Sequence, residues 1–389
     1  MKIPVGVPDF DEDEVQQAVK VIRSGWVARG EELEQFEQRL AEFIGVKYVV
    51  TVNSGTAALE VALRALEIEG KEVITTTTSC APTANGIIHS GNKPVMVDIS
   101  REDYNFDVEQ IEQHITPNTA AILPVHIYGR PANMERIMAI AQKHRLPVIE
   151  DCAQSLGAKF QGKMTGSFGE VGCFSLNINK VITTGEGGFI ATNNLTIAEK
   201  ARIIRNYGRE VSRSDYCYTM LGHNFKFTNL QAAIGLAQLN KIDRLIAARR
   251  SNAAYLTSLL NDVPGMQLPS EGKGEFSIFF SYPILLQQPG IRDQLKEFLE
   301  QQGIEVRTLF RPMCDQPYYQ KLMGKSQQQG SKSQQQGGKS KQQYPQAEYV
   351  GENGFYVGCY PSLTKEQLEY IAESIKEGLQ FVGRAPLKP

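Results

Sequence analysis

The sequence predicts an α/β protein with a mostly parallel, seven-stranded sheet, followed by a smaller C-terminal α+β domain. Short β-rich runs alternate with helical patterns from Tyr48 to about Asn194, as in consecutive βαβ units. The chain has 389 residues, which is long enough for two domains. After Leu230 the pattern changes to a long helical stretch and then to Gly/Pro turns mixed with strands and helices.

Seven apolar, β-rich runs are the expected strands of the sheet. They are residues 48–52, 72–75, 94–98, 121–125, 147–150, 172–175 and 188–192. Between the first two runs, Ala58, Val61 and Ala62 belong to a set of apolar residues at helical spacing, which predicts a helix with one face on the sheet. Residues 231–259 are rich in Ala, Leu and Arg, and they predict further helix.

The expected domains are a large one of residues 1–250, including the N-terminal segment, and a small one of residues 251–389. Inside the small domain, the sequence of residues 325–330 recurs at 332–337, in a glutamine-rich stretch of about 324–343. This stretch has no apolar side chain to bury, so it predicts a disordered surface insertion.

Composition excludes several classes of protein. There are 41 Lys and Arg residues against 43 Asp and Glu, a formal net charge of -2, so no basic excess exists to bind nucleic acid. The longest apolar runs, such as residues 120–125, fall far short of the roughly 20 residues that cross a bilayer. The N-terminal residues lack the apolar stretch of a secretory signal, and the six cysteines show no Cys-x-x-Cys spacing. We therefore expect a cytoplasmic protein that does not bind membranes.

The first segment that could bind a ligand is Ser54-Gly55-Thr56, which lies where the first strand ends and a helix begins. Unpaired backbone N–H groups and the positive end of the helix dipole meet there, glycine permits close approach, and two hydroxyls can donate. A phosphate group would fit this position. Alternatively, Ser54 or Thr56 is only the N-cap of the helix.

The second segment ends an apolar strand with Glu150 and Asp151. Ligands of open α/β sheets gather outside the carboxyl ends of the strands, so Asp151 is expected to face a ligand. A carboxylate at that depth needs a cationic or hydrogen-bonding partner. The alternative partner is an Arg or Lys of the fold itself.

The third segment places Lys180 ahead of a run rich in Gly and Thr, residues 183–188. Lysine amines with a lowered pKa form Schiff bases with carbonyl compounds, of which pyridoxal phosphate is the commonest cofactor. The alternative is an ordinary surface lysine in a turn. Together, the three segments offer a phosphate site, a carboxylate for a pyridine nitrogen and an amine for an aldehyde, which are what pyridoxal phosphate requires.

Other motifs are set aside. Residues 157–163 match the Gly and Lys spacing of a P-loop, but Met164 stands where a Ser or Thr is needed, so we expect a hairpin or loop. No Gly-x-Gly-x-x-Gly follows the first strand, which argues against a nicotinamide dehydrogenase. The five histidines show no metal-ligand spacing, and no metal is predicted.

Taken in order, the motifs resemble those of the DegT-type family of sugar aminotransferases, which are pyridoxal-phosphate enzymes of the aspartate-aminotransferase fold (fold type I). The resemblance covers nearly the whole chain. The matching motifs are residues 3–5, 24–26, 54–59, 125–129, 150–158, 174–175, Lys180, 183–188, 205–208, 222–225 and 231–233.

This resemblance implies roles for individual residues. Lys180 would form the Schiff base with the cofactor, Asp151 would pair with the pyridine nitrogen, and Gln154 would lie near the phenolic oxygen. Ser175 would hold the phosphate together with the Ser54-Gly55-Thr56 segment. Asn224 would reach that phosphate from the neighbouring subunit, which implies a homodimer with shared active sites.

The resemblance also implies a reaction. Glutamate would donate an amino group, a nucleotide-linked keto sugar would accept it, and Lys180 would move the proton as base and then acid. The branch of the family that removes a sugar hydroxyl carries His in place of Lys180. The run 183–188 resembles enzymes that aminate C4 of 4-keto-6-deoxy sugars, and residues 179–184 are most similar to the perosamine synthases, which use a GDP sugar.

Some residues depart from the family pattern. Cys80 stands where many members carry an aromatic residue that stacks on the cofactor, and Cys314 stands where His is frequent. The alternatives are therefore a C3 aminotransferase or a dehydratase of nucleotide sugars, a non-catalytic regulatory homologue, and an α/β nucleotide-binding protein without pyridoxal phosphate.

Overall fold

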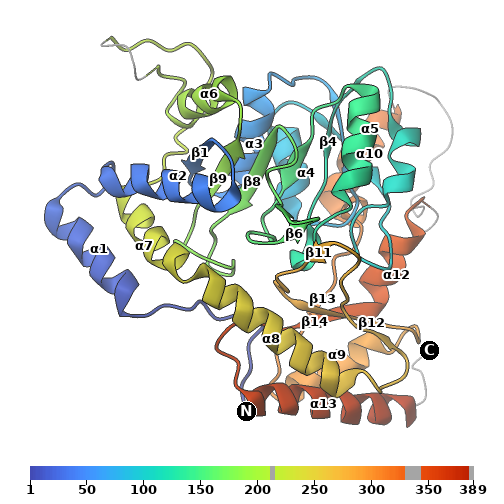
Figure 1. Cartoon of the computed structure of the whole chain (residues 1–389). Coiled ribbons are helices and arrows are strands. Elements are labelled where there is room, and N and C mark those ends of the chain that lie inside the picture. The colour runs from blue at the N-terminus through green and yellow to red at the C-terminus, as the bar shows by residue number, and fades with distance from the viewer. Residues whose placement is uncertain (211–214, 329–342, 385–389) are drawn as a thin grey trace.

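The computed structural model describes residues 1–210, 215–328 and 343–384 (Figure 1). Two N-terminal helices, α1 (Glu12–Ser24) and α2 (Glu31–Ile44), precede the sheet, and both pack on α7 (Asn229–Asn240). Each N-terminal helix ends at a glycine in the left-handed conformation, Gly25 and Gly45, which allows the chain to turn sharply.

The central sheet contains the seven predicted strands. They are β1 (Tyr48–Val52), β2 (Glu72–Thr76), β3 (Lys93–Val97), β4 (Thr119–Leu123), β5 (Ile149–Asp151), β8 (Val171–Ser175) and β9 (Gly188–Thr192). Their order is β1-β9-β8-β5 followed by β4-β2-β3, and parallel bridges from Ile122 to Val148 and from Val125 to Asp151 join the two halves. Only β9 runs antiparallel to its neighbours in this sheet, so the predicted mostly parallel sheet is confirmed.

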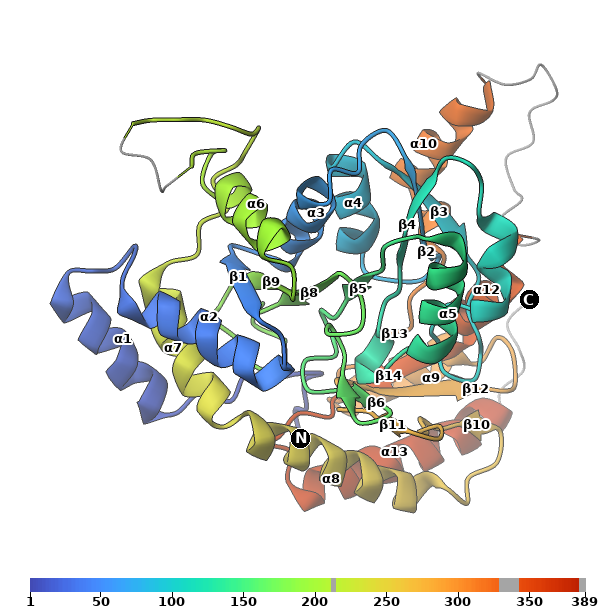
Figure 2. The same cartoon turned by 45° about the horizontal axis from the view of Figure 1, so that its top comes forward.

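Helices cover both faces of the sheet, which gives three layers (Figure 2). On one face, α3 (Gly55–Ala65), α4 (Ala81–His89) and α6 (Leu195–Arg205) share a core with side chains such as Val50 and Ile190. On the other face, α2 and α7 pack over Phe174 and Phe189, and α5 (Met134–His144) packs over Ile122. Because the side chains of a strand alternate between faces, neighbouring residues serve different cores.

The C-terminal part has its own antiparallel sheet in the order β10-β12-β14-β13. Its strands are β10 (Met266–Gln267), β12 (Tyr282–Leu286), β13 (Arg307–Thr308) and β14 (Gly354–Val357). The helices α8 (Ile242–Leu260), α9 (Arg292–Gln301) and α13 (Lys365–Arg384) supply the rest of this core, and Ile3 from the N-terminus joins it. Since α8 runs continuously through residue 251, the domain boundary at 250/251 stays a prediction.

The remaining elements bear on three further expectations. Residues 231–259 are helical, but α7 and α8 are separate helices on either side of Lys241. Residues 159–164 form a hairpin of β6 (Lys159–Phe160) and β7 (Lys163–Met164), extended by β11 (Glu275–Phe276), as expected for the rejected P-loop match. The first residues of the glutamine-rich stretch end α10 (Pro317–Gln328), residues 329–342 lie outside the described part, and α12 (Pro345–Asn353) follows.

None of the helices in the described ranges is long and apolar enough to span a membrane.

Candidate active site

The first site segment is the N-terminus of α3. Ser54 is the N-cap of this helix, and its Oγ accepts the backbone N–H of Ala57 at 3.1 Å. The simpler interpretation of Ser54 is therefore correct, but its hydroxyl hydrogen remains able to donate to an anion. A Cβ added to Gly55 would lie 2.8 Å from the Cβ of Ser175, so α3 begins directly against the end of β8. Glycine is required there because any side chain would fill that gap.

The second segment is the carboxyl end of β5, where the side chain of Asp151 is buried. Its Oδ2 accepts the hydroxyl of Thr83 at 2.7 Å, and its Oδ1 accepts the backbone N–H of Ala153 at 3.0 Å. In the described ranges, no Arg or Lys forms an ion pair with Asp151, so the alternative partner is not found. Burial raises the pKa of the Asp151 carboxyl, against the opposing effects of these hydrogen bonds and of the Lys180 charge.

The third segment is the connection between β8 and β9, which carries Lys180. Its Nζ lies 4.9 Å from the centre of the Phe280 ring. Burial lowers the pKa of the Lys180 amine, and the charges of Asp151 and Cys80 partly oppose that effect. Lys180 is thus no ordinary surface lysine, and a larger share of its amine is neutral and nucleophilic at neutral pH.

Gln154 is buried and its orientation is defined. Its Oε1 accepts the backbone N–H of Tyr128 at 2.8 Å, which leaves the amide NH₂ free to donate elsewhere. Tyr128 adopts a φ of 53°, in the left-handed region that is costly for a residue with a side chain. The hydrogen bond from the Tyr128 N–H therefore fixes which end of the Gln154 amide can meet a ligand.

Asn224 lies beside the strand that leads into α3. Asn53 donates its backbone N–H to the carbonyl of Phe225 at 3.0 Å and its side-chain amide to the carbonyl of Asn224 at 3.4 Å. The Asn224 side chain is exposed in the single chain. Its predicted contact with the cofactor of a neighbouring subunit stays a prediction.

Gly55 therefore lies against Ser175 at the end of β8, and Asp151, at the end of the neighbouring strand β5, lies within electrostatic range of Lys180. Their joint role in holding a cofactor stays a prediction. Sequence reasoning missed Thr83 and Phe280, which contact Asp151 and Lys180 from α4 and from the segment before β12. No local pattern marks either residue, because each contact joins segments far apart in the chain. Cys80, the exposed N-cap residue of α4, also lies within electrostatic range of Lys180.

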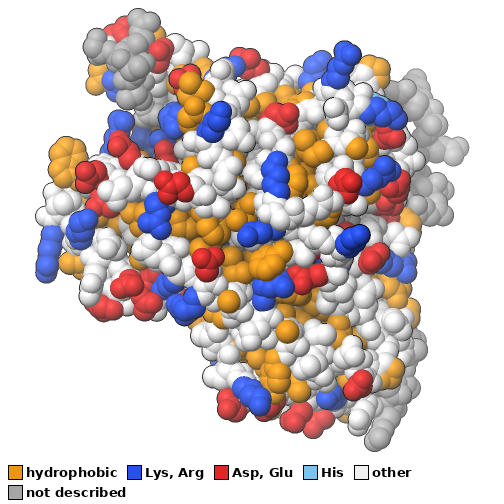
Figure 3. Space-filling model, in the orientation of Figure 1, with side chains coloured by type: hydrophobic (Ala, Val, Ile, Leu, Met, Phe, Trp, Pro, Cys, Tyr) orange, Lys and Arg blue, Asp and Glu red, His pale blue; other side chains and the backbone are white. Residues whose placement is uncertain are grey.

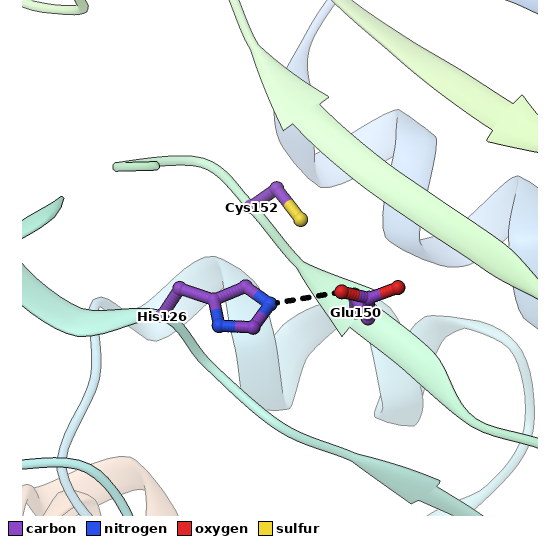
Figure 4. A group of neighbouring side chains, drawn as sticks. All are labelled: His126, Glu150 and Cys152. Carbon is purple, nitrogen blue, oxygen red and sulfur yellow. Dashed lines mark hydrogen bonds and ion pairs between the residues drawn. The ribbon is translucent and has the colours of Figure 1, made fainter. Parts of the chain in front are cut away.

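A buried cluster of His126, Glu150 and Cys152 lies beside the site (Figure 4), with its ligand-type atoms all within 4.8 Å of one another. His126 Nδ1 accepts the backbone N–H of Ala132 at 3.0 Å, so its Nε2 carries the proton and donates to Glu150 Oε2 at 3.1 Å. Three backbone N–H groups, of Gly166, Phe168 and Gly169, donate to the same carboxylate. Because these atoms already have partners, the cluster is a structural network rather than a vacant metal site.

The donor set fits a phosphorylated pyridine aldehyde. A helix N-terminus with hydroxyls suits the phosphate. The buried Asp151 carboxylate, which forms no ion pair with an Arg or Lys of the described ranges, suits the ring nitrogen, and the partly buried Lys180 amine suits the aldehyde. Residues 8–376 match the DegT/DnrJ/EryC1/StrS aminotransferase family, and the chain belongs to this family. It is a pyridoxal-phosphate-dependent sugar aminotransferase of fold type I.

Individual relatives refine this likeness. The chain is similar to GDP-perosamine synthases of Escherichia coli O157:H7, with 37% identity over 96% of this chain and 98% of the relative, and of Vibrio cholerae, with 35% identity over the same shares. A UDP-N-acetyl-3-dehydro-alpha-D-glucosamine 3-aminotransferase of Acidithiobacillus ferrooxidans is 35% identical over 94% of each chain. Among solved structures, Helicobacter pylori PseC, an aminotransferase involved in the biosynthesis of pseudoaminic acid, has a TM-score of 0.90 and 28% identity over 98% of this chain and 100% of its own.

Proposed function

We propose that this enzyme moves an amino group from glutamate to C4 of a GDP-linked 4-keto-6-deoxy sugar, as a GDP-perosamine synthase does. The observation that carries this proposal is the likeness to two GDP-perosamine synthases over almost the full length of both chains. The amino sugar would serve polysaccharide or glycoside biosynthesis in the cytoplasm.

The site residues support amino transfer. When bound, pyridoxal phosphate supplies an aldehyde that receives the amino group and a ring that takes up electrons. Lys180 would bind the aldehyde and, once the amino donor has displaced it, its Nζ would carry a proton from one carbon to another, for which its lowered pKa suits it. Asp151 would pair with the protonated ring nitrogen, Gln154 would donate its amide to the phenolic oxygen, and Ser54, Gly55, Thr56 and Ser175 would hold the phosphate.

The active protein would be a homodimer in which Asn224 completes the site of the partner subunit. Large apolar side chains are strongly exposed in the α1–α2 turn and in residues 216–221, with exposures of 71% for Trp26, 75% for Tyr216 and 76% for Leu221. Figure 3 shows apolar side chains at both places on the left of the molecule. Exposed aromatic residues of this kind favour burial against a second chain.

A nucleotide-sugar C3 aminotransferase is the second candidate, because the 3-aminotransferase relative matches almost as well. A dehydratase would not need the lysine amine as an amino-transfer group, so Lys180 argues against it. A regulatory homologue without catalysis predicts no turnover with any sugar.

The experiment is to incubate the purified protein, pyridoxal phosphate and ¹⁵N-glutamate with GDP-, UDP- and dTDP-linked 4-keto-6-deoxy sugars and with a UDP-linked 3-keto sugar. We expect ¹⁵N at C4 of the GDP sugar by NMR, and none with Lys180→Ala. Label at C3 would favour the second candidate, loss of the C3 hydroxyl would favour a dehydratase, and no product from any sugar would contradict the proposal. Omitting glutamate or replacing it with other amino acids tests the donor.

A further inference from the structure

A chain of hydroxyl groups ends on the buried carboxylate of the site. Thr83, in the first turn of α4, donates to Asp151 Oδ2 at 2.7 Å, and Ser79 Oγ lies 2.7 Å from Thr83 Oγ1. The three residues are buried, with exposures of 1% for Thr83, 6% for Ser79 and 3% for Asp151. Water therefore cannot replace these hydrogen bonds easily.

The direction of the chain follows from the charge of Asp151. An ionised carboxylate can only accept hydrogen bonds, so Thr83 must give its single hydroxyl hydrogen to Asp151. The oxygen of Thr83 is then an acceptor, and Ser79 must be the donor in the Ser79–Thr83 contact. The two hydroxyls point in one sense only while Asp151 is ionised.

Asp151 needs such donors because burial favours its neutral form. A neutral carboxyl would not pair with a protonated ring nitrogen, since the pairing depends on the negative charge. Glu150 precedes Asp151 on the same strand and carries a carboxyl group of its own. The groups around Asp151 that favour its charge are Thr83, the Ala153 N–H, Lys180 and, when it is protonated, His126. Of these, Thr83 is the one hydroxyl in direct contact with Asp151 in the described part of the chain.

We propose that Thr83, supported by Ser79, is a positioning residue that holds the Asp151 carboxylate ionised and oriented toward the cofactor ring nitrogen. The inference rests on the proposed cofactor role of Asp151 and does not depend on the identity of the sugar.

The test compares Thr83→Val, which has a similar shape without the hydroxyl, with Thr83→Ser, which keeps the donor, and with Ser79→Ala. In the holoenzyme, we expect Thr83→Val to weaken cofactor affinity by about tenfold or more, because a hydrogen bond to a charged group is lost. A less protonated ring withdraws fewer electrons, so the pH midpoint of the visible cofactor band should move to higher pH. Thr83→Ser should restore the wild-type cofactor affinity and band midpoint. Ser79→Ala should give an affinity and a midpoint between those of wild type and those of Thr83→Val.

A second readout uses the cofactor-free protein. The pKa of Asp151 is raised in the folded protein, so ionisation of Asp151 destabilises the fold increasingly as pH rises above the ordinary pKa of an aspartate. Thr83→Val should raise that pKa further, so its deficit in Tm relative to wild type should be larger at pH 8 than at pH 5. A purely structural role for Thr83 predicts the same deficit at both values.

Unchanged affinity and an unchanged band midpoint in Thr83→Val would overturn the inference, as would a failure of Thr83→Ser to restore them. An enzyme that binds its cofactor normally but aminates none of the sugars would contradict the proposed substrate and leave this result unaffected.

Discussion

Burial shifts the pKa values of the two ionisable groups at the centre of the site in opposite directions. It raises the pKa of Asp151 and lowers that of Lys180, so in each case the neutral form is favoured. The attraction between the two groups opposes both shifts. The carboxylate is thereby ready to gain a cationic partner, and the amine is ready to react with an aldehyde.

Asp151→Asn removes the charge and keeps the shape. We expect turnover to fall by about 100-fold or more, because the ring nitrogen loses the ion that keeps it protonated in a buried site. The protein should still fold, and its circular dichroism should match that of wild type. Steady-state kinetics at saturating pyridoxal phosphate separates this effect from weaker cofactor binding, and wild-type turnover there would refute the assigned role.

Asp103 gives a pH dependence that is independent of the active site. Its burial raises the pKa of this carboxyl to about 6, although Arg130 opposes the shift. The folded state favours the protonated form, so stability is greatest below the ordinary pKa and declines as pH rises toward 6.

Asp103→Asn should therefore raise the free energy of unfolding at pH 7.5 by on the order of 1–3 kcal/mol and by much less at pH 4. Urea unfolding at the two pH values measures this difference. An equal change in the free energy of unfolding at pH 4 and pH 7.5 would show that ionisation of Asp103 does not destabilise the fold.

Candidate site residues were predictable where the neighbouring sequence itself marks the end of a strand or the start of a helix. Asp151, Lys180 and the Ser54-Gly55-Thr56 segment stand at the ends of strands or the start of a helix, where ligands of α/β sheets gather. Thr83 and Phe280 were not predictable, because they reach the site from elements that are remote in sequence.

At the scale of elements, the site depends on how closely α3 approaches β8. The gap at Gly55 is smaller than a methyl group requires, and the N-cap at Ser54 fixes where the helix begins. The seven strands were predictable as apolar runs between turn signals. The antiparallel direction of β9 was not, because it depends on residues 176–187 returning the chain without a crossover helix.

Gly55→Ala should force α3 away from Ser175. We expect a loss of about 1–3 kcal/mol in stability, as for overpacking elsewhere, and weaker binding of pyridoxal phosphate. Thermal unfolding and cofactor titration measure these two effects. Gly6→Ala is the control, since its added Cβ would meet only Asn179 Oδ1, at 4.0 Å; an equally stable, tightly binding Gly55→Ala would show that the close approach is unimportant.

At the scale of the whole molecule, the fold class and the cofactor were predictable because many motifs occur in one order along the chain. The proposed homodimer could not be checked on one chain, because Asn224 is exposed there and its proposed contact is with a second copy. The glutamine-rich residues 329–342 lie outside the described part, so their predicted disorder is untested.

A shared site predicts complementation between two defective variants. In a mixed dimer of Lys180→Ala and Asn224→Ala chains, one site has both Lys180 and Asn224 intact and the other has neither. Refolding the two variants together should restore activity to about one site in four, as random pairing of a two-fold dimer requires. Activity no greater than the sum of the separate variants would place Asn224 in the site of its own chain.

The most direct measurement is to locate the cofactor on the chain. The holoenzyme is reduced with borohydride, digested and analysed by mass spectrometry, alongside Lys180→Ala treated in the same way. We predict that pyridoxal phosphate is attached to the peptide that contains Lys180, and that Lys180→Ala shows no attachment, no visible cofactor band and no turnover while it remains folded. Attachment to a different lysine, or full turnover by Lys180→Ala, would contradict the account.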